Sequence, residues 1–172
     1  PTPGASVRPI GRLVYLVLLL TLLSAAWPRL AIAQEIAPLA GETVVSNAND
    51  AGAGSLRQAI VDTPAGGVII FNSSLSGATI RLASQLTLAK NVTIDGSALA
   101  TQVTINGDTN NDSTGDVRLF TVNAGVTATL KNLTFTKGNA LSYGTPYGGA
   151  IYNDGDLTII NSTFSSNKGN YA

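Results

Sequence analysis

Residues 122–139 read VNAGVTATLKNLTFTKGN, and residues 152–170 read YNDGDLTIINSTFSSNKGN. The two stretches share an Asn-x-Gly start, an Asn-x-Thr-Phe centre and a Lys-Gly-Asn end, at offsets of 29 to 31 residues. Each contains brief runs of Val, Ile, Leu, Thr and Phe, separated by Asn, Asp, Gly, Ser or Lys. Such short, closely spaced runs are typical of stacked repeats rather than of antiparallel hairpins. The repeat therefore predicts a solenoid.

An earlier copy of the repeat is expected at Asn91-Val-Thr-Ile, which starts 41 residues before Asn132. We assign the extra length to the polar stretch from Gly107 to Asp116. Three strands in a coil of about 20–30 residues have the dimensions of a three-sided parallel β-helix. The alignment predicts two inward columns (Val92, Leu133, Ser162 and Ile94, Phe135, Phe164), an outward column (Thr93, Thr134, Thr163) and corners at Asn91, Asn132 and Asn161.

The segment before these coils differs from them. A short strand is expected to begin at Glu42, and Ser55 is placed to cap a helix that runs to Asp62 and ends before Pro64. Solenoids need their ends covered, so we assign a capping role to this helix. The expected organisation is an N-terminal strand and capping helix over residues 42–67, followed by coils over residues 68–172.

The first residues have the layout of a secretory signal peptide. Arg8 and Arg12 precede an uncharged apolar run of 14 residues, Leu13 to Ala26, and Ala31-Ile32-Ala33 supplies a small-x-small cleavage site. The run is short for a membrane-spanning helix. We predict a signal peptide over residues 1–33 and a linker over residues 34–41, with an uncleaved N-terminal anchor as the alternative. The expected location is secreted, at the cell surface or in the outer membrane.

The composition argues against several classes of site and partner. The chain has no Cys and no His, so a disulfide framework and a His or Cys metal site are absent. Ten Lys and Arg balance ten Asp and Glu, and three of the basic residues lie in the predicted signal peptide. The remainder carries a net charge of −3 without a basic patch, which argues against a nucleic-acid partner. Membrane association is expected only through the signal peptide or through an anchor beyond the chain.

Three stretches carry a family resemblance: NANDAGAGSLRQAI from Asn47, GGVIIFNSSLSGATIRL from Gly66, and NVTIDGS from Asn91. Together they resemble the N-terminal region of secreted bacterial right-handed parallel β-helix proteins of the pectin-lyase-like superfamily. More narrowly, the first stretch is similar to surface proteins with a C-S-L-R-E-A segment, although Gly54 replaces the Cys and Gln58 the Glu. GGAIYN from Gly148 and FSSN from Phe164 resemble repeats of polymorphic outer membrane proteins. The resemblance implies an all-β, right-handed three-sided β-helix, a surface location, and an adhesive or structural role.

The acidic stretch supplies the candidate metal site. Oxygen side chains alternate as they do in calcium loops, but the closing Glu of such loops is missing. Calcium is the only cofactor that the sequence suggests. The alternative is that the acidic stretch is a solvated insertion between two coils. The candidate ligands are Asp108, Asn110, Asp112 and Asp116.

Other candidate groups are scattered. Tyr143 and Tyr147 are candidate ligand contacts, while Tyr152 is expected to pack near the core. Arg81, Asp95, Asp154 and Asp156 are candidates for a polysaccharide lyase or hydrolase, although Asp residues beside Gly are also common in turns. Five N-x-Ser/Thr sequons are interpreted mainly as corner residues; they start at Asn72, Asn91, Asn111, Asn132 and Asn161.

Taken together, the sequence predicts the N-terminal part of a longer surface protein with an adhesin-like or structural binding role. The expected partners are a carbohydrate or a cell-surface protein. The alternative is a polysaccharide-active enzyme whose active site lies partly in further coils. An enzymatic role within this chain is the less favoured of the two.

Overall fold

The computed structural model describes residues 41–141 and 147–169. The predicted signal peptide, most of the linker and Tyr143 lie outside these residues. In chain order the elements are β1 (Glu42–Val45), α2 (Leu56–Asp62), β2 (Gly67–Phe71), the 3₁₀ helix η1 (Ser73–Leu75), β3 (Thr79–Arg81), β4 (Leu86–Leu88), β5 (Val92–Asp95), β6 (Val103–Asn106), β7 (Phe120–Val122), β8 (Thr127–Lys131), β9 (Leu133–Thr136), β10 (Ile151–Asn153), β11 (Asp156–Ile160) and β12 (Thr163–Ser165).

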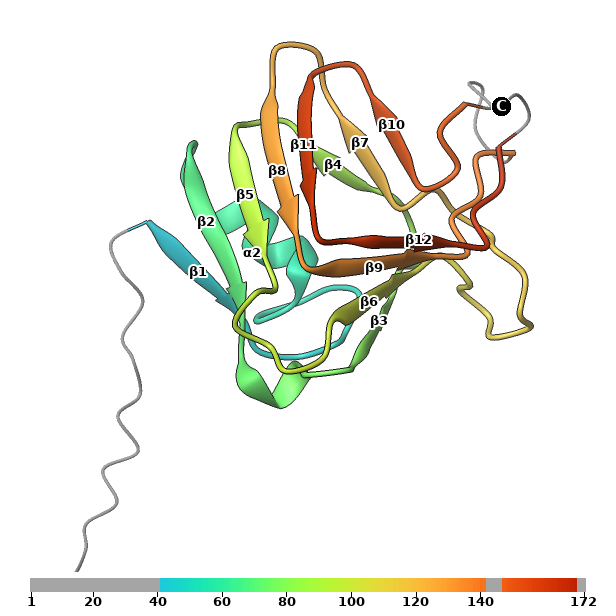
Figure 1. Ribbon diagram of the computed structural model, residues 1–172, viewed down its shortest axis with the longest axis horizontal. Coiled ribbons are helices and arrows are strands. Elements are labelled where there is room, and N and C mark those ends of the chain that lie inside the picture. Colours follow the sequence, from blue (N-terminus) through green and yellow to red (C-terminus); the bar gives the residue numbers. More distant parts are fainter. Residues whose placement is uncertain (1–40, 142–146, 170–172) are drawn as a thin grey trace, which may run out of the picture. The chain divides into compact units, whose positions relative to one another are not determined.

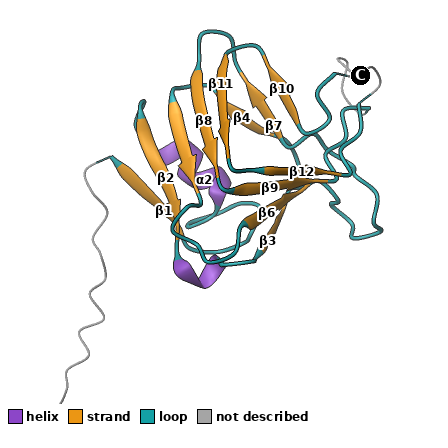
Figure 2. Cartoon of the chain, viewed as in Figure 1, coloured by secondary structure: helices purple, strands orange, loops and turns teal. Residues whose placement is uncertain are grey.

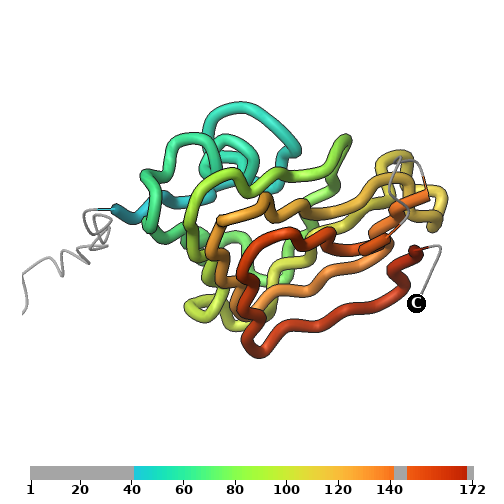
Figure 3. The backbone as a smooth tube through the Cα atoms, turned by 90° about the horizontal axis from the view of Figure 1, so that it is seen from above, coloured from blue at the N-terminus to red at the C-terminus, as the bar shows by residue number. Residues whose placement is uncertain are grey.

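The strands form three parallel sheets that wrap around one interior (Figure 1). Sheet A has the order β1-β2-β5-β8-β11, sheet B the order β12-β9-β6-β3, and sheet C the order β10-β7-β4. From β2 onward, successive strands along the chain belong to different sheets, and loops join them at the corners (Figure 2). Figure 3 shows the resulting coils stacked from the N-terminal side to the last coil, β10 to β12. The predicted fold class, an all-β three-sided parallel β-helix, is confirmed.

The interior is filled by columns of apolar side chains that repeat from coil to coil. Ile94 pairs in register with Leu130, and Ile105 with Phe135. All four side chains are fully buried. The Phe120 and Phe135 rings meet edge to face with centroids 5.9 Å apart. Parallel sheets covered on their inner face are stabilised mainly by this burial, at about 25 cal/mol per Å² of apolar area.

The predicted position of the earliest copy was wrong. Asn91 and β5 belong to sheet A, where Val92 pairs with Ala128 rather than stacking with Leu133. The true predecessor of β9 is β6, because Val103 pairs with Leu133. Both β5 and β6 read Val-Thr-Ile, since each strand must present the same alternation to the same interior. β6 begins 30 residues before β9, which agrees with the 29–31 residue offset seen elsewhere.

The outward threonines change accordingly. Thr79, Thr104, Thr134 and Thr163 form one column on sheet B, whereas Thr93 lies in a separate column on sheet A. The paired Lys-Gly-Asn ends are also out of register, because Asn139 bridges to Lys168. The conformation at the corners explains this shift. Lys137 and Ser166 each follow a sheet B strand directly and have φ values of 54° and 55°.

The predicted corner asparagines behave in two ways. Asn132 and Asn161 have φ values of 53° and 47°, in the left-handed region that Asn tolerates better than most residues. Each makes the sharp turn from sheet A to sheet B. Asn91 instead uses its side chain, because its Oδ1 accepts a hydrogen bond from the Thr127 N–H in the next coil.

The helix α2 lies beside the outer strand of sheet C. The Ser55 hydroxyl accepts the Gln58 N–H, as expected of an N-cap, and Leu56, Ala59 and Ile60 are buried in the core. Arg57 ties the helix to the residues before β4 by donating to the carbonyls of Ser84 (2.7 Å) and Gln85 (3.0 Å). The helix therefore stands where a further strand of sheet C would pair with β4. Its capping role stays a prediction.

Candidate functional site

The outer face of sheet C carries a cluster of polar and aromatic side chains. Thr87, Thr121 and Tyr152 occupy one outward column across β4, β7 and β10. Tyr152 is half-buried on this outer face, so the expectation that it packs near the core was wrong. The strand alternation explains the difference, because its neighbour Ile151 takes the inward position that pairs with Phe120.

Arg118 is the centre of this cluster. It lies two residues before β7 and is only 3% exposed. Its guanidinium donates to the carbonyls of Tyr147 (3.1 Å) and Gly148 (3.2 Å) and to Gln85 Oε1 (3.4 Å). The same group lies 5.0 Å from the centre of the Tyr152 ring, a cation–π distance. A planar guanidinium suits this combination of several acceptors with an aromatic face.

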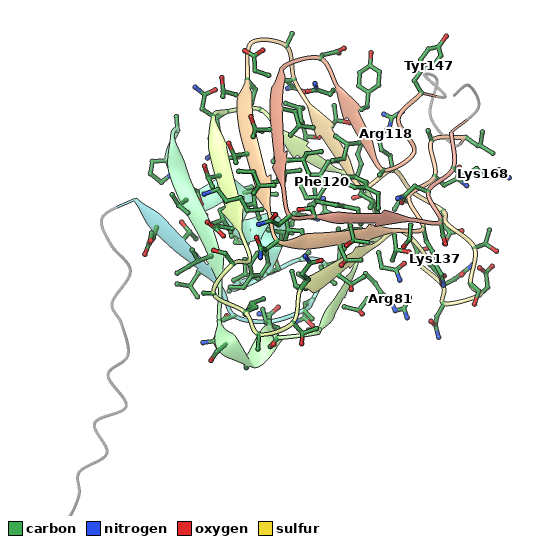
Figure 4. All side chains as sticks on the ribbon, viewed as in Figure 1. Arg81, Arg118, Phe120, Lys137, Tyr147 and Lys168 are labelled. Atoms are coloured by element: carbon green, nitrogen blue, oxygen red, sulfur yellow. The ribbon has the colours of Figure 1, made fainter. Side chains whose placement is uncertain are left out.

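Tyr147 is the exposed member of the cluster. The residue is 53% exposed, while its carbonyl accepts a hydrogen bond from Arg118. Figure 4 shows the Arg118 and Tyr147 side chains near each other at the edge of the molecule, above Phe120 in the interior. An aromatic side chain on an anchored backbone loses little entropy when it contacts a ligand. Tyr147 therefore stays a candidate ligand contact on this face.

Gln85 links this cluster to a neighbouring groove. Its Oε1 accepts from Arg118 and also from the Thr121 hydroxyl at 3.1 Å. The groove has a volume of about 210 Å³ and lies between α2 and β4. Its lining residues are Arg57, Ile60, Val61, Gln85, Leu86 and Thr87. The groove and the aromatic cluster thus form one band across the outer face of sheet C.

Tyr152 is also adjacent to an acidic side chain. A hydrogen bond to Asp154 raises the pKa of the Tyr152 phenol, and the negative charge of Asp154 acts in the same direction. The phenol therefore keeps its proton and stays a hydrogen-bond donor.

The candidate calcium loop is organised around a buried ion pair. The Asp108 side chain is fully buried and lies 2.8 Å from Lys137 Nζ and 3.8 Å from Arg81 Nη1. Its two oxygens also accept the backbone N–H groups of Asp112 and Ser113, each at 3.1 Å. The hydrogen bond from Lys137 holds the pKa of Asp108 below its usual value of 3.8. The carboxylate thus has a cation supplied by the chain itself.

The other predicted ligands are engaged within the loop. Asp112 accepts from Asn110 Nδ2 and from the Thr114 N–H, and the latter bond is the main cause of its lowered pKa. Asp116 accepts both the N–H and the hydroxyl of Thr109 at 2.7 Å. Among residues 41–141 and 147–169, no group of three acidic, His or Cys side chains is placed to hold a metal. Calcium binding stays a prediction, and it would have to displace the Lys137 ammonium.

The four candidate catalytic residues are not brought together. Asp95 pairs with Lys131 at 3.2 Å on sheet A, and Arg81 lies on sheet B near Asp108. Asp156 starts β11 opposite Thr127, whereas Asp95 is in register with Lys131 at the other end of β8. Four residues of strand separate these levels by roughly 13 Å. The arrangement does not form two carboxylates facing each other across a cleft.

The neighbours of Asp95 account for its ionisation. Partial burial acts to raise the pKa of Asp95. The hydrogen bonds with Ser97 and Lys131 outweigh that effect and hold the pKa below 3.8. A lowered pKa suits a structural ion pair better than a general acid, which needs a raised one.

The sequon asparagines have structural positions. Asn72 caps the 3₁₀ helix η1 through its side chain, and Asn111 has a φ of 64° in the loop that contains Asp108. Together with the corner positions of Asn91, Asn132 and Asn161, these roles account for each residue without a modification.

The sequence did not reveal the role of Arg118. Arg118 precedes an apolar strand and matches no motif, so its contacts depend on the coil-to-coil register. One signal was available: it is a lone basic residue directly before the inward pair Leu119 and Phe120. A charged side chain at the mouth of a buried strand needs partners, and carbonyls of the next coil supply them here.

Comparisons with protein-family models, with curated proteins and with solved structures found no match to this chain. Within the described part of the chain, no helix has the length and apolar character needed to cross a bilayer.

Proposed function

We propose that this chain is part of a secreted or surface-displayed bacterial β-helix protein with an adhesin-like binding role. In this proposal the stacked coils form a rigid support, and the outer face of sheet C contacts a carbohydrate or a cell-surface protein. The observation that carries the proposal is Tyr147, an exposed aromatic ring whose backbone is fixed by a buried Arg118.

The chemistry of the band favours a neutral sugar chain as the first ligand to test. Tyr147 offers a ring face for stacking, and Thr87 adds a hydroxyl along the same face. Gln85 is hydrogen-bonded to Arg118 and to the Thr121 hydroxyl. These bonds hold the Gln85 amide and the Thr121 hydroxyl in place within the band. Stacking on a rigid aromatic with a few placed hydrogen-bonding groups is a common recognition mode.

A binding survey with soluble and insoluble polysaccharides would test the proposal. We expect Tyr147→Ala to weaken binding by about tenfold, the effect of losing one aromatic anchor. Ile160→Ala is the matched control, because Ile160 is 39% exposed but lies on β11 of sheet A, outside the band on sheet C. Equal binding by the wild type and the Tyr147 variant to every ligand that is retained would contradict the assignment of this face.

The same samples separate a binding role from polysaccharide cleavage. We expect retention of the polysaccharide without new reducing ends or unsaturated products. Product formation that is lost in Asp95→Ala or Asp154→Ala would instead support an enzyme. The predicted export is checked by the mature N-terminus, which we expect at or near Gln34.

A further inference from the structure

The groove between α2 and β4 has walls that are fixed at both ends of the helix. Near the start of α2, Arg57 donates to the carbonyls of Ser84 (2.7 Å) and Gln85 (3.0 Å), just before β4. Near the end of α2, the carbonyl of Val61 accepts a 2.8 Å hydrogen bond from Lys90, which lies two residues after β4. These bonds hold the helix beside the strand along its length. The groove is therefore formed before a ligand arrives, as small-molecule sites usually are.

The size of the groove suits one unit of a sugar chain. Its volume is about 210 Å³, and a hollow of about 260 Å³ continues it beside Ala89 and Lys90. Pockets that enclose a whole drug-sized ligand begin at about 300 Å³. Each part of the groove is smaller than that, so it accommodates a single unit or substituent of a longer ligand.

Gln85 brings unused N–H donors to the groove. Its Oε1 accepts hydrogen bonds from the Arg118 guanidinium and from the Thr121 hydroxyl. A guanidinium only donates, so the Gln85 atom that faces Arg118 must be the oxygen, which settles the orientation of the amide. Among residues 41–141 and 147–169, no acceptor is bonded to Nε2 of Gln85. That nitrogen can therefore donate to a ligand carbonyl.

The remainder of the groove combines an apolar wall with one hydroxyl. The apolar lining residues are Ile60, Val61 and Leu86. Thr87 adds an exposed hydroxyl that has no hydrogen-bond partner within the described part of the chain. The charge of Arg57 is balanced by Asp50 at 2.6 Å, so this end of the groove favours an uncharged group. A ligand that fits must offer a carbonyl, an N–H and a small apolar group close together.

We propose that the groove binds the acetamido group of an N-acetylated sugar. The proposal rests on sugar binding by the outer face of sheet C, and it names the class of sugar. The Gln85 amide donates to the acetamido carbonyl, and the Thr87 hydroxyl accepts the acetamido N–H. The methyl group packs on Ile60 and Val61. A sugar hydroxyl in the same place would lose water without gaining these contacts.

Two trisaccharides that differ only at C2 of each unit test the proposal on the full chain. N-acetylchitotriose carries an acetamido group where cellotriose carries a hydroxyl. We expect isothermal titration calorimetry to show that N-acetylchitotriose binds about tenfold tighter or more, the effect of one buried methyl group and its neighbouring hydrogen bonds.

Variants locate the preference in the groove. Gln85→Glu removes the N–H donors but keeps an oxygen for Arg118 and Thr121, and it should reduce the preference for N-acetylchitotriose about tenfold. Val61→Ser should reduce the preference as well, and Val61 is 65% exposed, so the change leaves the core intact. Ile160→Ala on sheet A is the control and should leave the preference unchanged. Chemical denaturation confirms that each variant is folded.

Several results would overturn the proposal. They are equal affinities for the two trisaccharides, no binding of N-acetylchitotriose, tighter binding of a uronic-acid trisaccharide, which would assign the contact to Lys90, and a preference that Gln85→Glu does not alter.

Failure of this proposal can be told apart from failure of the binding role at Tyr147. Tyr147→Ala should weaken both trisaccharides alike, so their affinity ratio reports on the groove and their common loss reports on Tyr147. A wild-type chain that binds another polysaccharide through Tyr147 but has no preference for the acetamido group would keep the binding role and remove only the acetamido site.

Discussion

The ammonium of Lys137 donates a 2.8 Å hydrogen bond to the carboxylate of Asp108, whose side chain is fully buried. Lys137 follows β9 at a left-handed corner, and Asp108 begins the loop that precedes β7. The pair therefore joins two successive coils at the point where the chain leaves the repeat. The side-chain cation of Lys137 therefore helps to order this loop from within the fold.

Removal of the lysine charge should destabilise the fold. We expect Lys137→Met to lower the urea midpoint of unfolding, because Asp108 stays buried while Arg81, at 3.8 Å, is its only remaining close cation among the described residues. Lys168→Met is the matched control, since Lys168 is exposed one coil later. An equal effect of the two substitutions would contradict a special role for the buried pair.

Acid should destabilise the fold through the Asp108 carboxylate. The folded-state pKa of Asp108 lies below 3.8, so the unfolded chain binds its proton first as the pH falls. The stabilisation is complete above 3.8 and is lost as the pH falls through the lower folded-state pKa. We expect the free energy of unfolding of Asp108→Asn to depend less on pH in this acid range. Parallel curves for the two proteins would show that other carboxyl groups, such as Asp95, dominate.

Phe135 and Phe164 occupy one column but should contribute different amounts to the free energy of unfolding. Phe135→Ala creates a cavity in a fully buried position and should cost about 3–5 kcal/mol of unfolding free energy. Phe164 is 43% exposed, so Phe164→Ala should cost about 1–2 kcal/mol. Chemical denaturation of both variants measures the difference. Similar costs would mean that the last coil is as well covered as the coil before it.

Gly54 should not tolerate a cysteine, the first residue of the C-S-L-R-E-A segment. Its φ is 77°, and a Cβ would collide with Ser46 Oγ and approach Asn47 Nδ2 to 2.7 Å. Gly52 has a φ of 91° but open space around it, so Gly52→Ala isolates the backbone strain, at about 1–2 kcal/mol. We expect Gly54→Cys to lower the melting temperature more than Gly52→Ala does. The reverse order would show that the loop around Ser46 rearranges.

The repeat period could be read from the sequence, but the assignment of strands to sheets could not be read in full. The pairing of Phe135 with Phe164 followed directly from the 29-residue offset. The strand after Asn91 was assigned to the wrong sheet, because Val-Thr-Ile suits any sheet of a solenoid in which inward and outward residues alternate. The 30-residue spacing from Val103 to Leu133 was the better guide, because it is close to the 29-residue offset between Phe135 and Phe164 on the same sheet.

The candidate site was less predictable than the fold. Tyr147 was identified from its aromatic character, but the residue that fixes it, Arg118, acts on carbonyls 29 and 30 residues away. Every residue has a backbone carbonyl, so the residue types in the sequence do not indicate which carbonyls Arg118 contacts. The Asp108 loop shows the same limit, because its acidic pattern resembled a metal site while its cation came from Lys137 in the next coil.

The helix beside β4 also has a consequence for how the chain folds. At the N-terminal end, β1, α2 and β2 are consecutive in the chain and β1 pairs with β2, so most of this end forms from local contacts. Each following coil then pairs with a preformed edge, and every step closes a loop of only about 30 residues. We therefore expect vectorial folding, in which the first-synthesised residues act as the nucleus and coils add in the order of synthesis. Truncation from the C-terminus should leave the remaining coils intact, whereas loss of α2 should prevent folding throughout.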